Sequence, residues 1–235
     1  MEKLPLTVYD ILNYLGAGFV LIASLDLALN AGWLATKEIP AGQIALLLII
    51  AYVTGHIVAN FSGFFWEGIA VRRLLSAPEF TLFANEKKKR SWLRFVFPAY
   101  FEPLPDQTQR RVFEAASASG ITSPGRALFF HCYAIVKQNP VVYGRLTIFL
   151  NLYGFCRNVG AACVIAAGIL WFGATFGEWR GRPAQIIKLW WAAGALFAGI
   201  MLFYRYLKFY RHYTLEVFTS FAEKGTMVAP ERQKL

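Results

Sequence analysis

The chain has 235 residues, of which 57% are hydrophobic, 17% are aromatic and only 16% are charged. Soluble domains carry about 25% charged residues, so this composition argues against an ordinary water-soluble enzyme. The high aromatic content excludes a disordered chain. Three cysteines are too few for a secreted domain held together by disulfides, and no two of them form a C-x-x-C pair.

Four apolar stretches are long enough to cross a hydrocarbon core of about 30 Å, which takes about 20 helical residues. They cover residues 9–33, 42–66, 146–172 and 186–207, with tryptophan and tyrosine residues near their ends. Such rings favour the membrane interface. The sequence therefore predicts an all-α integral membrane protein with four transmembrane helices. Asp26 interrupts the first stretch and no small-residue cleavage motif follows it, so we expect a retained helix rather than a signal peptide.

Lysine and arginine are distributed unevenly along the chain. Residues 67–143 hold eleven of the 24, and the chain from Arg205 onward holds six. By the positive-inside rule, both termini and the long middle segment face the cytoplasm, and we expect the membrane to be the bacterial inner membrane. Arg180, Arg182 and Lys188, which lie between or beside the last two spans, weigh slightly against this orientation.

The same pattern divides the chain into four parts. Residues 1–66 and 144–207 contain the transmembrane helices, residues 67–143 form a small helical cytoplasmic segment, and residues 208–235 form a helix extension and tail. We expect the second span to continue as a helix to about Leu75 and to be broken by Pro78.

Further helices are predicted in the cytoplasmic segment by their capping residues. One begins at Asp106, which has capping-box spacing with Gln109. Another has Ser123 as its N-cap and ends before Pro140, where the chain re-enters the membrane.

The basic residues near the cytoplasmic ends of the spans are predicted to contact anionic lipid heads or a protein partner. Between Lys87 and Phe97, cations alternate with aromatic residues, which fits either a segment lying on a membrane surface or a solvated charged run beside a small core. We expect lipid rather than nucleic acid as the partner of these charges. The predicted contacts are Arg72, Arg73, Lys87, Lys88, Lys89, Arg90, Arg94, Arg205, Lys208 and Arg211.

Polar residues within the spans are the candidate functional residues, because ionisable groups in lipid are costly and usually face a bundle interior or a wet cavity. Counted from the cytoplasmic side at 1.5 Å per residue, Arg157 and His56 lie about 18 and 15 Å deep, whereas Asn60 and Asn151 both lie about 9 Å deep. This count pairs His56 with Arg157, and Asn60 with Asn151. Asparagine contacts often only hold helices together, but an arginine at this depth points to a function. The candidates are Asp26, His56, Asn60, Asn151, Arg157 and Asn158.

Small residues in the third and fourth spans predict close helix packing. They include Gly154, Gly160 and Gly168 in the third span, and Gly194 and Gly199 in the fourth.

No motif for catalysis, metal binding or cofactor binding stands out. G-x-S-x-G, H-E-x-x-H and a glycine-rich phosphate loop are absent from the sequence. We therefore expect no metal, no cofactor and no enzyme, with one exception: His56 could act as a general base while Asn60 and Arg157 bind an anionic head group.

Two hypotheses about function remain open. The first is a homo-oligomeric membrane protein, channel-like or signal-responsive and gated from the cytoplasmic side, with or without a cytoplasmic protein partner. Its polar residues would line a pore or hold a closed state. The second is an intramembrane enzyme or carrier acting on a lipid or small anion through His56, Asn60 and Arg157, in which the polar groups converge within one protomer.

Overall fold

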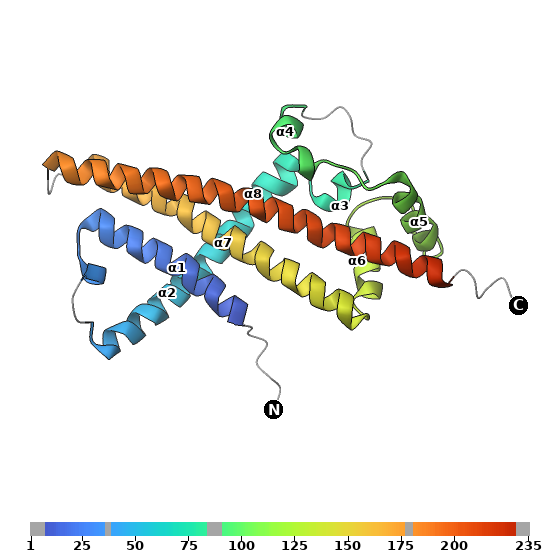
Figure 1. Ribbon diagram of the computed structural model, residues 1–235, viewed down its shortest axis with the longest axis horizontal. Helices are drawn as coiled ribbons and strands as arrows, with labels where there is room; N and C mark the ends of the chain where they lie inside the picture. The colour runs from blue at the N-terminus through green and yellow to red at the C-terminus, as the bar shows by residue number, and fades with distance from the viewer. Residues whose placement is uncertain (1–7, 36–38, 84–90, 177–180, 229–235) are drawn as a thin grey trace, which may run out of the picture. The chain divides into compact units, whose positions relative to one another are not determined.

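The computed structural model describes residues 8–35, 39–83, 91–176 and 181–228 (Figure 1). Helices dominate these residues, and none of them belongs to a β-strand. Four of the helical segments are long and apolar enough to cross a membrane. The prediction of an all-α integral membrane protein is confirmed at this level.

The four long helices overlap the four predicted spans. The last two extend beyond their spans at both ends, whereas the first ends at Leu29, before the predicted end at residue 33. They are α1 (Val8–Leu29), α2 (Ala41–Ser62), α7 (Pro140–Phe176) and α8 (Gly181–Val228). Helix α7 begins at Pro140, where the chain was expected to re-enter the membrane, and α8 runs without a break from Gly181 to Val228. A proline in the first turn of a helix loses no hydrogen bond, because that N–H has no partner within the helix.

The second span continues directly into a π-helical segment, η2 (Gly63–Leu75). The predicted extension to Leu75 is thus correct in its end point but not in its geometry. π-Helices are rare, are mostly a single turn long, and often occur at functional sites. After Leu75 the chain turns at Ser76, whose φ of 68° is left-handed, and a short helix α3 (Pro78–Thr81) follows.

The chain forms two compact units: Met1–Ile69 with Tyr153–Tyr206, and Ala70–Leu152 with Leu207–Leu235. In the first unit, α1 and α2 cross so closely that their backbones touch (Figure 1). A Cβ atom on Gly18 would overlap the carbonyl of Ala51, and one on Gly55 would overlap the carbonyl of Tyr14. Only glycine permits this approach.

Helices α7 and α8 also pack through glycines in the first unit. A Cβ on Gly199 would lie 3.1 Å from the carbonyl oxygen of Gly160 and 2.8 Å from a methyl group of Val164. By contrast, Gly168 and Gly194, which the sequence analysis assigned to close packing, face open space in the described structure. Small residues permit two helices to approach closely, but they do not by themselves determine which face of each helix makes the contact.

The second unit has its own apolar core beneath α5 (Asp106–Ser117) and α6 (Arg126–Val136). Both helices pack against the start of α7 and the extension of α8. The core residues include Leu82, Leu104, Val112, Leu128, Val136, Leu146, Val217 and Phe218.

Both predicted helix caps in this unit are wrong. Pro105 precedes α5 and offers no side-chain cap; Gln109 instead donates from Nε2 to the carbonyl oxygen of Leu104 (2.7 Å). Helix α6 starts after Gly125, not Ser123. Gly125 has a φ of 132°, and a Cβ there would lie 2.9 Å from the Phe80 ring. Tertiary packing at this glycine therefore sets the helix start.

The basic and aromatic run ends in a short helix, α4 (Ser91–Val96), followed by a 3₁₀ turn, η3 (Pro98–Tyr100). Phe95 on α4 is 88% exposed, and Trp92 is also exposed. Lys87, Lys88, Lys89 and Arg90 lie outside the described residues. Two large apolar side chains on this helix are thus exposed near Arg94.

Candidate functional site

An ion pair between Glu67 and Arg157 forms the centre of the candidate site. Glu67 lies on η2 and Arg157 on α7, and the Arg157 Nη1 atom is 3.0 Å from Glu67 Oε2. The side chains are only 18% and 19% exposed, respectively. Two opposite charges in contact largely remove the cost that either would have alone in a low-dielectric region.

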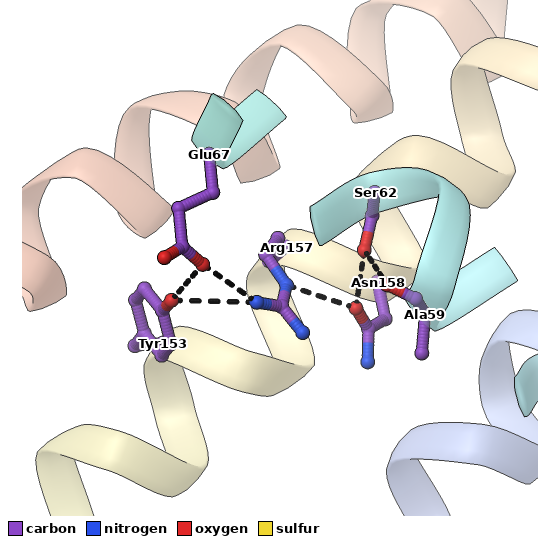
Figure 2. A network of polar contacts seen from close by, with 6 residues as sticks. All are labelled: Ala59, Ser62, Glu67, Tyr153, Arg157 and Asn158. Atoms are coloured by element: carbon purple, nitrogen blue, oxygen red, sulfur yellow. Dashed lines mark hydrogen bonds and ion pairs between the residues drawn. The ribbon is translucent and has the colours of Figure 1, made fainter. Parts of the chain in front are cut away.

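Hydrogen bonds extend this pair along α7 and back to α2, as Figure 2 shows. The Tyr153 hydroxyl donates to Glu67 Oε2 (2.7 Å), and Arg157 donates from Nε to the Asn158 side-chain oxygen (3.1 Å). That oxygen also accepts a bond from the Ser62 hydroxyl (2.6 Å). We call Ser62, Glu67, Tyr153, Arg157 and Asn158 the polar cluster. Each of its polar groups orients another.

Aromatic rings surround the polar cluster. The Arg157 guanidinium lies 5.5 Å from the centre of the Tyr153 ring, and the Tyr153 ring lies 5.2 Å from that of Tyr206. Trp66 on η2 contacts the rings of Phe203 and Tyr206 on α8. Low polarity around an ion pair strengthens the attraction between its charges, so this aromatic shell favours a tightly held ion pair.

The structure gives Arg157 different neighbours from those the depth count indicated. The His56 ring stacks on Tyr14 of α1, with ring centres 3.8 Å apart, and contacts Tyr52 edge-on. Asn60 is exposed and donates to the backbone oxygen of His56 within its own helix. The count assumed a continuous α-helix from Trp66 inward, whereas η2 continues the helix with a different pitch.

The remaining predicted residues lie in three different places. Asn158 belongs to the polar cluster and is 1% exposed. Asn151 is half-buried and belongs to the second compact unit. Asp26 is buried near the end of α1, where its carboxylate accepts hydrogen bonds from the backbone N–H groups of Trp33 (2.7 Å) and Leu34 (3.3 Å). The geometry thus assigns Asp26 to the turn after α1.

We expect Asp26→Ala to lower the free energy of unfolding by about 1 kcal/mol, because two backbone donors in the turn η1 (Trp33–Ala35) lose their acceptor. Asp26→Asn keeps one acceptor oxygen and is expected to retain most of the stability. Thermal unfolding of the purified protein in detergent micelles, followed by circular dichroism, measures both. Equal losses for the two variants would show that charge, rather than hydrogen bonding, is what the turn requires.

The predicted lipid contacts fall into separate places. Arg72, Arg73 and Arg94 line one cavity of the second unit, and Arg211 donates to the backbone oxygen of Glu102 (2.9 Å). Arg205 and Lys208 are exposed on α8.

Nothing in the described residues resembles a metal or redox centre. No group of three or more histidine, cysteine or acidic side chains is close enough to hold a metal ion within the described ranges. All three cysteines are buried and unpaired. Burial raises the pKa of Cys132, on α6, to about 12, so this thiol stays protonated at neutral pH and is a poor nucleophile.

Comparison with protein-family models, with curated proteins and with solved structures gave no match to this chain.

Ser62 and Tyr153 were not among the residues predicted from the sequence, and Glu67 was expected only at the cytoplasmic end of the second span. Two signals pointed to this group. Glu67 is the only carboxylate between Glu38 and Glu79, and Tyr153 has i, i+4 spacing with Arg157 on one helix face. An intramembrane arginine needs a counter-charge, so the nearest acidic residue on a neighbouring span was the candidate to test first.

Proposed function

We propose that the protein is a homo-oligomeric component of the bacterial inner membrane, channel-like or signal-responsive, that is gated from the cytoplasmic side. The observation that carries this proposal is the Glu67–Arg157 ion pair, which joins the π-helical segment η2 to α7. In this arrangement Arg157 is neutralised within one chain and stabilises a closed state. Membrane lipids, and a cytoplasmic protein that delivers the signal, are its proposed partners.

The π-helical geometry of η2 supports a gating role. A segment that changes between π- and α-helical hydrogen bonding turns its successive side chains around the helix axis. Such a change in Gly63–Leu75 would carry Glu67 away from Arg157 and leave an unpaired cation beside α2. If the freed guanidinium faces a pore, it favours the passage of anions.

The orientation with both termini in the cytoplasm is part of the proposal. Lys188 weighed against it as a charge near the opposite end of the spans. However, the Lys188 side chain is buried and donates from Nζ to the backbone oxygen of Ala28 (2.8 Å), near the end of α1. A lysine that satisfies a helix-terminal carbonyl has a local structural role, so it is weak evidence about topology.

Assembly from several copies is supported by the exposed face of α2. This face is apolar, with Ile49, Val53 and Ile57 exposed, yet it also presents the carboxamide of Asn60. An exposed amide within an apolar span gains a hydrogen-bond partner when a second helix packs on it, and such contacts contribute about 0.6 kcal/mol or more. We therefore place the subunit interface on α2.

The alternative is an intramembrane carrier or enzyme acting on a lipid or small anion. The convergence of the polar cluster within one protomer is what this alternative requires. A transported anion would displace the Glu67 carboxylate from Arg157. However, His56, its proposed base, stacks on Tyr14.

Ion efflux from proteoliposomes tests the gate. We expect the wild-type chain to be nearly silent and Glu67→Gln to raise chloride efflux at least about tenfold, which is the change in open population that about 1.4 kcal/mol produces. Arg157→Gln should also open the gate but reduce the preference for chloride over potassium. Glu114→Gln, the same chemical change at an exposed position on α5, is the matched control.

Efflux that stays at the wild-type level in both Glu67→Gln and Arg157→Gln would remove the support for a gate at this ion pair. Uptake of a labelled anion that saturates with its concentration, and that Arg157→Gln abolishes, would favour the carrier.

A further inference from the structure

The first compact unit contains a cavity of about 830 Å³ near the ends of α1 and α7. Its lining comes from residues 25–30, at the end of α1 and in the turn after it, and from residues 165–176 of α7. Both helices are long and apolar enough to cross a membrane. Ligand sites for small molecules typically have volumes of about 300–1,000 Å³ and mostly apolar linings. When α1 and α7 span a bilayer, this cavity therefore lies beside lipid chains.

Two glycines of α7 shape the cavity in different ways. A Cβ atom on Gly173 would lie 2.9 Å from the Cβ of Ala28, so α1 and α7 touch at that level. Gly168 also lines the cavity, but a Cβ atom there would meet nothing within 4 Å. Glycine in a helix interior is less favourable than alanine. Packing against α1 explains Gly173, whereas Gly168 leaves room that no described residue fills.

Long apolar side chains form the walls. Leu25 and Leu29 line the cavity from α1, and Phe172 and Phe176 line it from α7. The two phenylalanine rings lie 4.6 Å apart, centre to centre. All four side chains are exposed, so the cavity is open at the surface of the unit rather than sealed within it. An apolar molecule in the surrounding bilayer can therefore reach it.

The dimensions of the cavity fit one acyl chain. Its lining on α7 runs from Ile165 to Phe176, which is about 16 Å at 1.5 Å per residue. One leaflet fills half of a hydrocarbon core of about 30 Å, which is about 15 Å. A side chain from a second packed helix instead fills a hole formed by four residues. Ten of the described residues line this cavity, so its shape favours a lipid chain over a helix of a second copy.

Among the described lining residues, only Asn30 has a polar side chain. This residue follows α1 directly, is half-buried, and has no hydrogen-bond partner for its carboxamide within the described part of the chain. Its left-handed φ of 51° has a local explanation, because the N–H of Ala31 donates to the carbonyl oxygen of Asp26 (3.1 Å) and closes a Schellman motif. Glycine would suit that backbone equally well, so the motif does not require the carboxamide.

The position of Asn30 suits the ester group of a phospholipid. The ester carbonyl joins the acyl chain to the head group, and Asn30 lies at the end of a helix that could span the membrane, beside an apolar cavity. A carboxamide N–H donates readily to a carbonyl oxygen. The acyl chain would then occupy the cavity while its ester accepts a hydrogen bond at the end of α1.

Contacts within the first unit hold the end of α1 in place. Lys188 on α8 donates from Nζ to the carbonyl oxygen of Ala28 (2.8 Å). The Asp26 carboxylate accepts a hydrogen bond from the backbone N–H of Trp33 (2.7 Å), which fixes the turn that follows Asn30. A site that is organised before its ligand arrives avoids part of the entropic cost of binding.

We propose that this cavity binds one acyl chain of a membrane phospholipid, with the Asn30 carboxamide donating a hydrogen bond to the ester carbonyl of that chain. Lipid chains are as apolar as leucine, so the preference over bulk lipid comes from close packing and from the hydrogen bond rather than from hydrophobic burial. The proposal does not depend on the gating function above, because no residue of the polar cluster lines this cavity.

The test is photo-crosslinking of the full-length chain in detergent micelles with a phosphatidylethanolamine that carries a diazirine group on one acyl chain. Mass spectrometry maps the labelled residues, and unlabelled phosphatidylethanolamine is the competitor. We expect labelling that the competitor removes and that is concentrated in residues 25–30 and 165–176. Glycerophosphoethanolamine, which has the same head group but no acyl chains, should not compete.

Gly168→Phe fills the cavity with a ring and should lower the labelling of these residues at least about tenfold. The matched control is Gly194→Phe, the same change at an exposed glycine of α8 outside the cavity, where a Cβ atom also meets nothing within 4 Å. This control should be labelled like the wild type. Labelling that persists in Gly168→Phe, that falls equally in both variants, or that the competitor does not remove would overturn the proposal.

Asn30→Gly removes the carboxamide and keeps a residue that adopts the left-handed backbone. We expect an unchanged thermal midpoint and an affinity for the phospholipid competitor that falls about threefold, the effect of one hydrogen bond of typical strength in a membrane. Competition by hexadecane, which has no ester, should not change. An unchanged phospholipid affinity would overturn the role of Asn30.

A second copy of the chain is the competing occupant. Absence of competed labelling, together with a disulfide-linked dimer in Gly168→Cys, would assign the cavity to that copy and overturn the proposal. The thermal midpoint of each variant verifies that it is folded.

Discussion

Glu67→Gln is expected to lower the free energy of unfolding by about 3 kcal/mol. The substitution leaves Arg157 charged in a largely buried position, where its Nη1 atom now has a carboxylate 3.0 Å away. Removing one partner of a buried ion pair costs about 3–5 kcal/mol, because the remaining charge loses its compensation. We take the lower end of this range, since both side chains are still partly exposed.

Arg157→Gln should cost a similar amount, because it leaves the Glu67 carboxylate with the Tyr153 hydroxyl as its remaining donor among the polar cluster. The double variant Glu67→Gln/Arg157→Gln should be more stable than either single variant, because it removes both charges of the pair. Thermal unfolding in detergent micelles gives the free energy of unfolding of the wild type and of the three variants. The difference between the loss in the double variant and the sum of the two single losses is the coupling energy of the pair.

Additive losses in this cycle would mean that the two side chains act independently, and the ion pair would then have no role in holding η2 to α7. The pair between Arg145 of α7 and Glu216 of α8 provides a comparison cycle outside the polar cluster, since its carboxylate is as buried as that of Glu67 but its arginine is 55% exposed. Its coupling should be below about 1 kcal/mol, as for other surface ion pairs.

Gly55→Val is expected to lower the free energy of unfolding by about 3 kcal/mol or more. The new Cβ would overlap the backbone carbonyl of Tyr14, and a backbone atom cannot move aside as a flexible side chain can. Inserting volume into a well-packed contact costs about 1–3 kcal/mol, and more where the backbone must separate. Gly18→Val should behave in the same way against Ala51.

Gly194→Val is the matched control for both glycine variants. Gly194 lies within α8, where a Cβ atom meets nothing within 4 Å. We expect this substitution to change the thermal midpoint only slightly, because glycine and valine both have modest helix propensities. A loss at Gly55 no larger than that at Gly194 would show that the close crossing of α1 and α2 is not maintained in solution.

The loss of the α1–α2 crossing should also alter the surroundings of His56. Its ring stacks on Tyr14, the residue whose carbonyl faces Gly55. Gly55→Val should therefore disturb both contacts together.

The number, order and approximate ends of the long helices follow from the sequence. The length of each apolar run, about 20 residues, follows from the thickness of the hydrocarbon core. Its helical form follows because a chain in lipid must satisfy its backbone hydrogen bonds internally, which few structures besides a helix allow. Proline restricts helices through local geometry. The start of α7 at Pro140 and the end of η2 at Leu75, shortly before Pro78, were therefore also predictable. Each of these features depends on residues close together in the chain.

The partners of the polar side chains were decided by the tertiary structure alone. Arg157 could be recognised from its residue type, but its pairing with Glu67 depends on the π-helical pitch of η2, and composition does not reveal that pitch. The same holds for the glycines: Gly55 lies at a backbone crossing whereas Gly194 faces open space, although both lie in apolar helices. Hydropathy determines which segments enter the membrane, because it is a sum over neighbouring residues. Which side chains then meet depends on the pitch, rotation and crossing of helices that are far apart in the sequence.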